Sequence, residues 1–129
     1  MTRKLVSSGS YLEPIIGFSR AVRVGNIISV GGTAPIAEGG GTAGKGDVHA
    51  QTVRCLEISK KAIEDAGGRI EDAIRTRLIL TDISRWEEAA RAHAEFFRDI
   101  RPVTTLMAVS GFVDPDWLVE TEVDCVVGD

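Results

Sequence analysis

Residues 118–127 constrain the fold more than any other segment, because acidic and mostly apolar residues alternate along them. Glu120, Glu122 and Asp124 stand at every second position, and Val, Thr, Val, Cys and Val occupy the positions around them. Successive side chains of a strand point to opposite faces of a sheet. The segment is therefore predicted to be a strand with one acidic face and one mostly apolar face, which places a core on one side of the sheet.

The chain has the composition of one globular domain, expected over residues 1–129, with 43% hydrophobic residues. It contains no run of about 18 apolar residues, and its N-terminus lacks the regions of a signal peptide. We therefore expect a cytoplasmic protein with no membrane partner. The formal net charge is −4, with 15 Lys and Arg scattered among 19 acids, which argues against a nucleic-acid partner.

The cysteines and histidines show no metal or nucleophile pattern. Cys55 and Cys125 lack a paired-thiol spacing, and His49 and His93 have no second ligand at metal spacing. We expect two buried, reduced thiols, no metal and no cofactor. His93 is interpreted as a hydrogen-bonded helix residue rather than a catalytic base.

The first half of the chain predicts a β-hairpin, a loop and a helix. Strand-like runs at 21–24 and 27–30 flank Gly25-Asn26, a turn pair typical of hairpins. Residues 38–46 carry five glycines but lack the Gly-Lys-Ser/Thr ending of a phosphate-binding loop. Asp47 is a candidate N-cap for a helix over 48–66, which Gly67-Gly68 would end.

The second half predicts a strand over 74–80, a second helix, and strands over 105–109 and 118–127. Ser84 and Glu87 have capping-box spacing for a helix that reaches about Ile100. The expected buried stripe of this helix is Trp86, Ala89, Ala90, His93, Phe96, Phe97 and Ile100.

This order of elements predicts an α+β fold in which two helices cover one face of a mixed sheet of five or six strands. The other face has no helix to cover it, and it would carry apolar residues such as Ile79 among the charged ones. A half-covered sheet can face water only where that face is polar. Burial against partner subunits is therefore expected, without a defined number of subunits.

Several short motifs together resemble the YjgF/Rid family, the reactive intermediate deaminases often catalogued as endoribonuclease L-PSP. Arg101-Pro102-Val103-Thr104-Thr105 and Leu118-Val119-Glu120-Thr121-Glu122 resemble its C-terminal signature. Ile16-Gly17-Phe18-Ser19-Arg20-Ala21-Val22 is similar to its Gly-Pro-Tyr-Ser-Gln-Ala-Val element, Val30-Gly31-Gly32-Thr33-Ala34-Pro35 to its Val-Ser-Gly-Gln-Ile-Pro, and Leu80-Thr81-Asp82 to its Leu-Thr-Asp. The resemblance covers nearly the whole chain.

The resemblance implies a chorismate-mutase-like homotrimer in which three sheets form a central barrel and small-molecule clefts lie between subunits. The family activity is hydrolysis of an imine or enamine with release of ammonia, and the glutamate that matches Glu120 is thought to position the attacking water. From the residue pattern alone, Glu120 would instead be one member of a solvated acidic strand face.

Three polar anchors of the family cleft are missing. Thr104 stands where deaminating members have an arginine that holds the substrate carboxylate, Phe18 replaces a tyrosine and Gly31 a serine. A neutral hydrogen bond contributes roughly 0.5 to 1.5 kcal/mol, against about 1.5 to 3 for one to a charged group. Affinity for small α-imino acids should therefore be poor. The resemblance implies a pocket lined by Phe18, Gly32, Thr33, Thr104, Thr105, Met107 and Glu120.

Arg20 and Arg101 are the basic residues nearest to these motifs in sequence, and either could replace the missing clamp. Both are expected at the surface, as most arginines are.

Two functions stay open. Glu120 favours a Rid-like deaminase with altered specificity, and the lost anchors favour a non-catalytic trimer that binds a small metabolite. Ribonuclease action is disfavoured by the acidic balance and the lack of a histidine pair.

Overall fold

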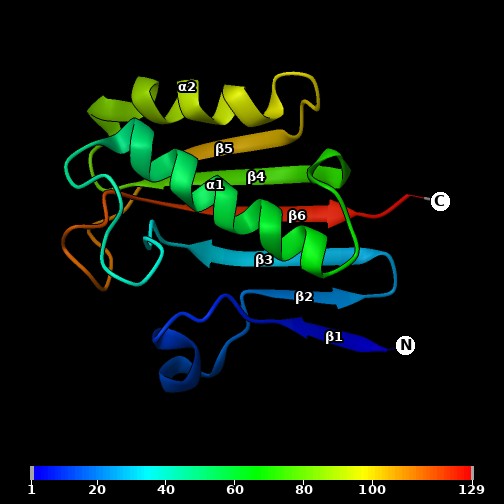
Figure 1. Ribbon diagram of the computed structural model, residues 1–129. Coiled ribbons are helices and arrows are strands. Elements are labelled where there is room, and N and C mark those ends of the chain that lie inside the picture. Colours follow the sequence, from blue (N-terminus) through cyan, green and yellow to red (C-terminus); the bar gives the residue numbers. More distant parts are fainter. Residues whose placement is uncertain (1, 129) are drawn as a thin grey trace.

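The computed structural model describes residues 2–128, and its six strands form one mixed sheet (Figure 1). The strands are β1 (Arg3–Val6), β2 (Ala21–Val24), β3 (Ile27–Thr33), β4 (Ala73–Leu80), β5 (Val103–Ala108) and β6 (Val119–Val126). Their spatial order is β1-β2-β3-β6-β4-β5, and only β4 and β5 run parallel. β5 is thus an edge strand, separated from β3 by β6 and β4.

Both long helices lie across the same face of the sheet (Figure 1), which confirms the predicted architecture. The first, α1 (Val48–Asp65), begins where the sequence predicts, because Asp47 Oδ1 accepts a hydrogen bond from the Ala50 amide at 2.9 Å. Gly67 ends it with a φ of 89°, a left-handed conformation that glycine adopts without a Cβ clash. In residues 2–128 no helix is both long and apolar enough to span a membrane.

The start of the second helix, α2 (Trp86–Phe97), differs from the prediction. The Ser84 hydroxyl donates to Asp82 Oδ1 at 2.6 Å, so it does not cap the helix, and residues 83–85 form the short 3-10 helix η3 (Ile83–Arg85) instead. The predicted capping box is therefore wrong. Trp86, placed in the buried stripe, is 48% exposed, and the helix ends three residues before Ile100.

Two shorter helical turns were not predicted. The π-helical turn η1 (Glu13–Gly17) follows β1, and the 3-10 helix η2 (Ile70–Asp72) precedes β4. The fifth strand also begins earlier than predicted, at Val103 rather than Thr105, because its pairing with β4 extends to Arg75. Thr104 consequently lies inside a strand.

The alternation of the last strand is confirmed. Val119, Thr121, Val123 and Cys125 are all at most 1% exposed and face the helices. The acidic residues face the other side, where Arg77 Nη1 lies 3.0 Å from Glu122 Oε1 and 3.8 Å from Asp124 Oδ2. We call this second side, which no helix covers, the open face.

Candidate functional site

Glu120 lies against a glycine-rich irregularity of β3. The pairing of β3 with β6 shifts register between Val30 and Thr33, which frees Gly31 and Gly32 from the regular ladder. A Cβ placed on Gly32 would stand 2.8 Å from Glu120 Oε1. Only glycine therefore leaves room for the carboxylate in its present position.

The environment of Glu120 makes its carboxyl a better proton acceptor than an exposed glutamate. Burial is the largest effect and raises its pKa, the nearby Glu122 raises it further, and Arg20 opposes them, so that the net pKa is raised. No residue in the described chain donates a hydrogen bond to this carboxylate. A half-buried acid with a raised pKa is typical of groups that exchange protons with a substrate.

Arg20 is buried, so the prediction of a surface guanidinium is wrong. The residue is only 4% exposed. Its Nη1 donates to the carbonyl of Gly32 at 2.6 Å, to the carbonyl of Gly31 at 3.2 Å and to Thr33 Oγ1 at 3.0 Å. The register shift leaves these carbonyls without ladder partners, and the guanidinium supplies the donors. Arg20 thus holds the glycine segment from the helix-covered side, opposite Glu120.

Phe18 and Thr33 both contact Arg20. The Cζ of Arg20 lies 5.1 Å from the centroid of the Phe18 ring, within cation–π range. Thr33 is 1% exposed, donates to the Gly31 carbonyl at 2.8 Å, and accepts from Ser59 of α1 at 3.4 Å. Thr33 therefore belongs to the helix-covered side of the β3 segment, and the Phe18 ring packs on the Arg20 guanidinium.

The predicted residues on β5 form a second, separate group. Thr104 Oγ1 lies 2.8 Å from Thr76 Oγ1, which in turn lies 2.8 Å from His93 Nε2 of α2. Thr104 thus points to the helix-covered side. Thr105 and Met107 have the opposite orientation and point to the open face. There Met107 of β5 is the register partner of Ile79 of β4, and Ile79 is the register partner of Glu120 of β6.

Within one chain, the structure does not bring these two groups together. Gly31 and Gly32 adjoin Glu120, but two strands separate β3 from Thr104, Thr105 and Met107. Arg101 is exposed, as predicted, and its Nε donates to the Arg98 carbonyl at 2.9 Å. It contributes to neither group.

His93, Cys55 and Cys125 have the environments predicted for them. His93 is a hydrogen-bonded helix residue, and burial lowers its pKa. Cys55 and Cys125 are free and buried, and burial raises the pKa of Cys125 to about 12. No cluster of three His, Cys, Asp or Glu side chains in residues 2–128 is placed to hold a metal ion.

Glu13 holds the turn over residues 8–10, a contact that the family motifs do not indicate. Its Oε2 accepts hydrogen bonds from the Ser8 amide at 3.0 Å and the Ser10 amide at 3.1 Å. Burial raises its pKa, but hydrogen bonds from Ser7, Ser8 and Ser10 lower it by more, so the carboxylate is ionised. The spacing of Ser10 and Glu13 matches Ser-x-x-Glu, the signal that could have identified this turn.

Comparison with known proteins places this geometry in a family. The family model described as endoribonuclease L-PSP matches residues 8–127. The chain belongs to this family. A Streptomyces coelicolor protein is 41% identical over 123 residues, 95% of this chain and 91% of that protein. The 3-aminoacrylate deaminase RutC of Acinetobacter baylyi is 29% identical over 120 residues, 93% of this chain and 94% of that protein.

Solved structures agree with membership in the L-PSP family. A YjgF-family protein from Mycobacterium tuberculosis superimposes with a TM-score of 0.88 at 41% identity, covering 98% of this chain and 100% of that one. The YjgF protein of E. coli superimposes with a TM-score of 0.78 at 23% identity, covering 95% and 91%. The resemblance and fold predicted from the motifs are therefore confirmed.

Proposed function

We propose that the protein is a Rid-like hydrolytic deaminase of a reactive imine or enamine, with specificity altered by the absence of a carboxylate-binding arginine at Thr104. The observation that carries this proposal is Glu120, a half-buried carboxyl with a raised pKa packed against Gly32. The deaminase name of the Acinetobacter baylyi relative supports the reaction class.

In the proposed reaction, Glu120 acts as the base that positions and activates water. The water oxygen bonds to the carbon of the protonated C=N group while Glu120 takes one water proton, which gives a neutral carbinolamine. Glu120 then returns that proton to nitrogen, the C–N bond breaks and ammonia leaves, and the hydroxyl proton passes to Glu120 as the C=O group forms. A positioned acid–base group of this kind contributes about 10²- to 10⁴-fold to the rate.

We further propose that the active cleft forms between subunits of a homotrimer. This arrangement would place the edge strand β5 of one subunit, which carries Thr104, Thr105 and Met107, next to Gly31, Gly32 and Glu120 of its neighbour; within one chain, β6 and β4 separate β5 from β3. Sedimentation should give a species of about three times the 13.8 kDa chain mass. A 13.8 kDa monomer at micromolar concentration would contradict the trimer.

The expected substrate is larger or less charged than a small α-imino acid. Thr104 carries no charge, and its hydroxyl also donates to the Pro102 carbonyl at 3.2 Å. A bidentate guanidinium contact to a carboxylate is much stronger than any contact this hydroxyl can offer. Turnover of 2-iminobutanoate and 2-iminopropanoate should therefore be weak or absent.

Ammonia release from a panel of imines generated in solution tests the reaction. Glu120→Gln should lower the rate on the best substrate by at least about a hundredfold, because the amide cannot accept the proton. Glu122→Gln is the matched control, since Glu122 lies on the same face two residues further along β6. Equal rates for wild type and Glu120→Gln would leave the alternative function, a non-catalytic trimer that binds a small metabolite.

A further inference from the structure

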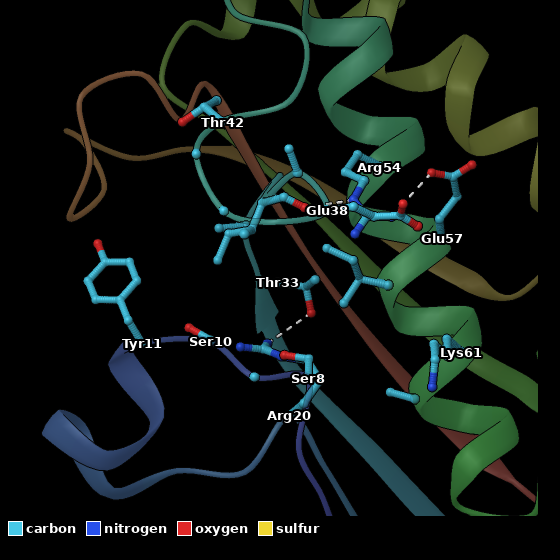
Figure 2. Close-up of a pocket in the computed structure, with 18 of the residues that line it drawn as sticks. Ser8, Ser10, Tyr11, Arg20, Thr33, Glu38, Thr42, Arg54, Glu57 and Lys61 are labelled. Atoms are coloured by element: carbon cyan, nitrogen blue, oxygen red, sulfur yellow. Dashed lines mark hydrogen bonds and ion pairs between the residues drawn. The ribbon is translucent and has the colours of Figure 1, made fainter.

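A cavity away from Glu120 lies on the helix-covered side of the sheet. It has a volume of about 700 Å³ and is enclosed by residues 7–11, the glycine-rich loop over 36–42, and α1. Figure 2 shows the Arg20 guanidinium near Ser8 and Ser10, with Thr33 above it. Gly31, Gly32 and Glu120 do not line it. The glycine segment of β3 therefore separates this cavity from the proposed reaction site.

One nitrogen of the Arg20 guanidinium has no partner. Nη1 and Nε make every hydrogen bond of this side chain, the Nε bond being to Ser8 Oγ at 3.4 Å. Nη2 has no acceptor in residues 2–128. The only fully enclosed side-chain nitrogen or oxygen without a partner in that range is Thr121 Oγ1. Arg20 Nη2 therefore keeps some accessible surface, and Arg20 is one of the residues that line the cavity.

The charge of Arg20 is also without a direct counter-ion. No carboxylate of the described residues lies within 4.0 Å of its guanidinium. Glu13 and Glu120 act on it only at longer range, and the Glu13 carboxylate is engaged by Ser8 and Ser10. A buried charge is costly unless it is paired. An anion in the cavity would supply the missing partner at hydrogen-bond distance.

The other two cationic side chains that line the cavity are paired with carboxylates. Among the described residues of the wall, Arg20 is therefore the cation without a direct counter-ion. Lys61 Nζ lies 2.8 Å from Asp65 Oδ2, and Arg54 donates to the Ile36 carbonyl at 2.6 Å besides facing Glu57 at 3.7 Å. Glu13 and Glu120 already compensate part of the positive charge of the Arg20 guanidinium. The remaining charge matches a ligand with a single negative charge better than a phosphate dianion. The remaining wall is mixed. It carries the hydroxyl groups of residues 7–11 and the carboxylates of Glu38 and Asp114, and its aliphatic part consists of Ala34, Ile36, Ala37, Ile58 and Ala62.

We propose that this cavity binds a small organic monocarboxylate, with its carboxylate on Arg20 Nη2 and its carbon chain against the aliphatic part of the wall between the glycine-rich loop and α1. The site is separate from the proposed deaminase cleft, and its existence does not depend on that function. The ligand class follows from one free guanidinium nitrogen, the hydroxyls of Ser8 and Ser10, and the aliphatic part of the wall.

Binding is tested with butanoate as the probe and butanamide as its neutral isostere, by calorimetry and amide chemical-shift mapping of the wild-type protein. Butanoate should bind saturably and shift the amides of Ser8, Thr33 and Ile58, while butanamide should not bind. This measurement needs no variant. Shifts confined to Gly32 and Glu122 would place butanoate in the open-face site and overturn the proposal, as would equal binding of both probes.

Two variants of α1 locate the site. Ile58→Trp fills the cavity without touching a hydrogen bond of Arg20 and should abolish butanoate binding. Val53→Trp is the matched control, because Val53 lies on the same helix and lines a different hollow. Unchanged butanoate binding in folded Ile58→Trp would overturn the proposal, as would equal loss in both variants.

Arg20→Lys tests the guanidinium itself. Lysine keeps the charge but lacks the planar fork, so butanoate should bind at least about tenfold more weakly. Glu120→Gln should leave binding intact, which separates failure of this site from failure of the proposed reaction. Undiminished binding in folded Arg20→Lys would contradict the role of Nη2.

Discussion

Arg20 and Glu120 lie on opposite sides of the same glycine segment, and the chain solvates their charges in opposite ways. Arg20 makes four hydrogen bonds through Nε and Nη1, two of them to the carbonyls of that segment. Glu120 receives none from the described residues, and burial raises its pKa. The comparison suggests that the well-bonded charge shapes the site, and that the poorly bonded charge is the one free to react.

The largest expected effect on stability comes from removing the well-bonded charge. Arg20→Met keeps a similar aliphatic stem but leaves the Gly31 and Gly32 carbonyls without their donor, and each unsatisfied buried group costs about 1 to 3 kcal/mol. We expect the free energy of unfolding in urea to fall by about 3 kcal/mol. Arg54→Met, on the wall of the same cavity, is the control and should cost about 1 kcal/mol. Equal losses would refute the special role given to Arg20.

Changing the glycine between the two charges should reduce activity by about tenfold or more. In Gly32→Ala the new Cβ would meet Glu120 Oε1 at 2.8 Å, so the carboxylate must move away from its position beside the segment. The displaced group ends a flexible side chain, so stability should change little. Gly31→Ala is the control, because nothing lies within 4 Å of its added Cβ. Full ammonia release by Gly32→Ala would show that the position of Glu120 is unimportant.

Thr104→Arg should raise turnover of 2-iminobutanoate by about tenfold, the equivalent of 1.4 kcal/mol of added binding. The guanidinium would supply the carboxylate contact that the chain lacks. The gain should vanish in Thr104→Arg/Glu120→Gln. A folded, trimeric Thr104→Arg protein with no gain would indicate that Phe18 and Gly31 have reshaped the cleft, and would favour the metabolite-binding alternative.

The smallest predicted effect is on the way the stability of the fold changes with pH. A carboxyl whose pKa is raised in the folded state binds more protons there than in the unfolded chain, so its contribution to stability falls as pH rises from the unfolded pKa through the folded one. Glu120→Gln should therefore melt at a higher temperature than wild type at pH 7. The difference should disappear below the unfolded glutamate pKa of about 4.3. A lower melting temperature at pH 7 would mean that the charge stabilises the fold.

Local patterns in the sequence predicted most of the fold. The alternation along residues 118–127 identified the last strand and its two faces, and Asp47 marked the start of α1 correctly. The capping box at Ser84 failed because Asp82, two residues earlier, binds the serine hydroxyl. Such competition between neighbouring polar side chains depends on geometry that spacing alone does not specify.

The site was less predictable, because its contacts join distant parts of the chain. The Arg20 guanidinium binds the carbonyls of Gly31 and Gly32, which lie 11 and 12 residues further along the chain. No local sequence pattern shows this contact. The direction of Thr104 depended on where β5 begins, and the predicted start at Thr105 left that direction undefined. The two groups of predicted site residues are separated by strand order, which the motifs do not encode.

A subunit-mixing assay tests the central claim most directly, namely that β5 of one chain and Glu120 of its neighbour complete one hydrolytic cleft. Thr104→Arg/Glu120→Gln chains are co-refolded with wild-type chains, native mass spectrometry verifies the mixed trimers, and ammonia release from 2-iminobutanoate is measured. The account predicts activity above the weighted mean of the two parents, because mixed trimers join the new guanidinium to an intact Glu120. Activity equal to that mean would contradict the account.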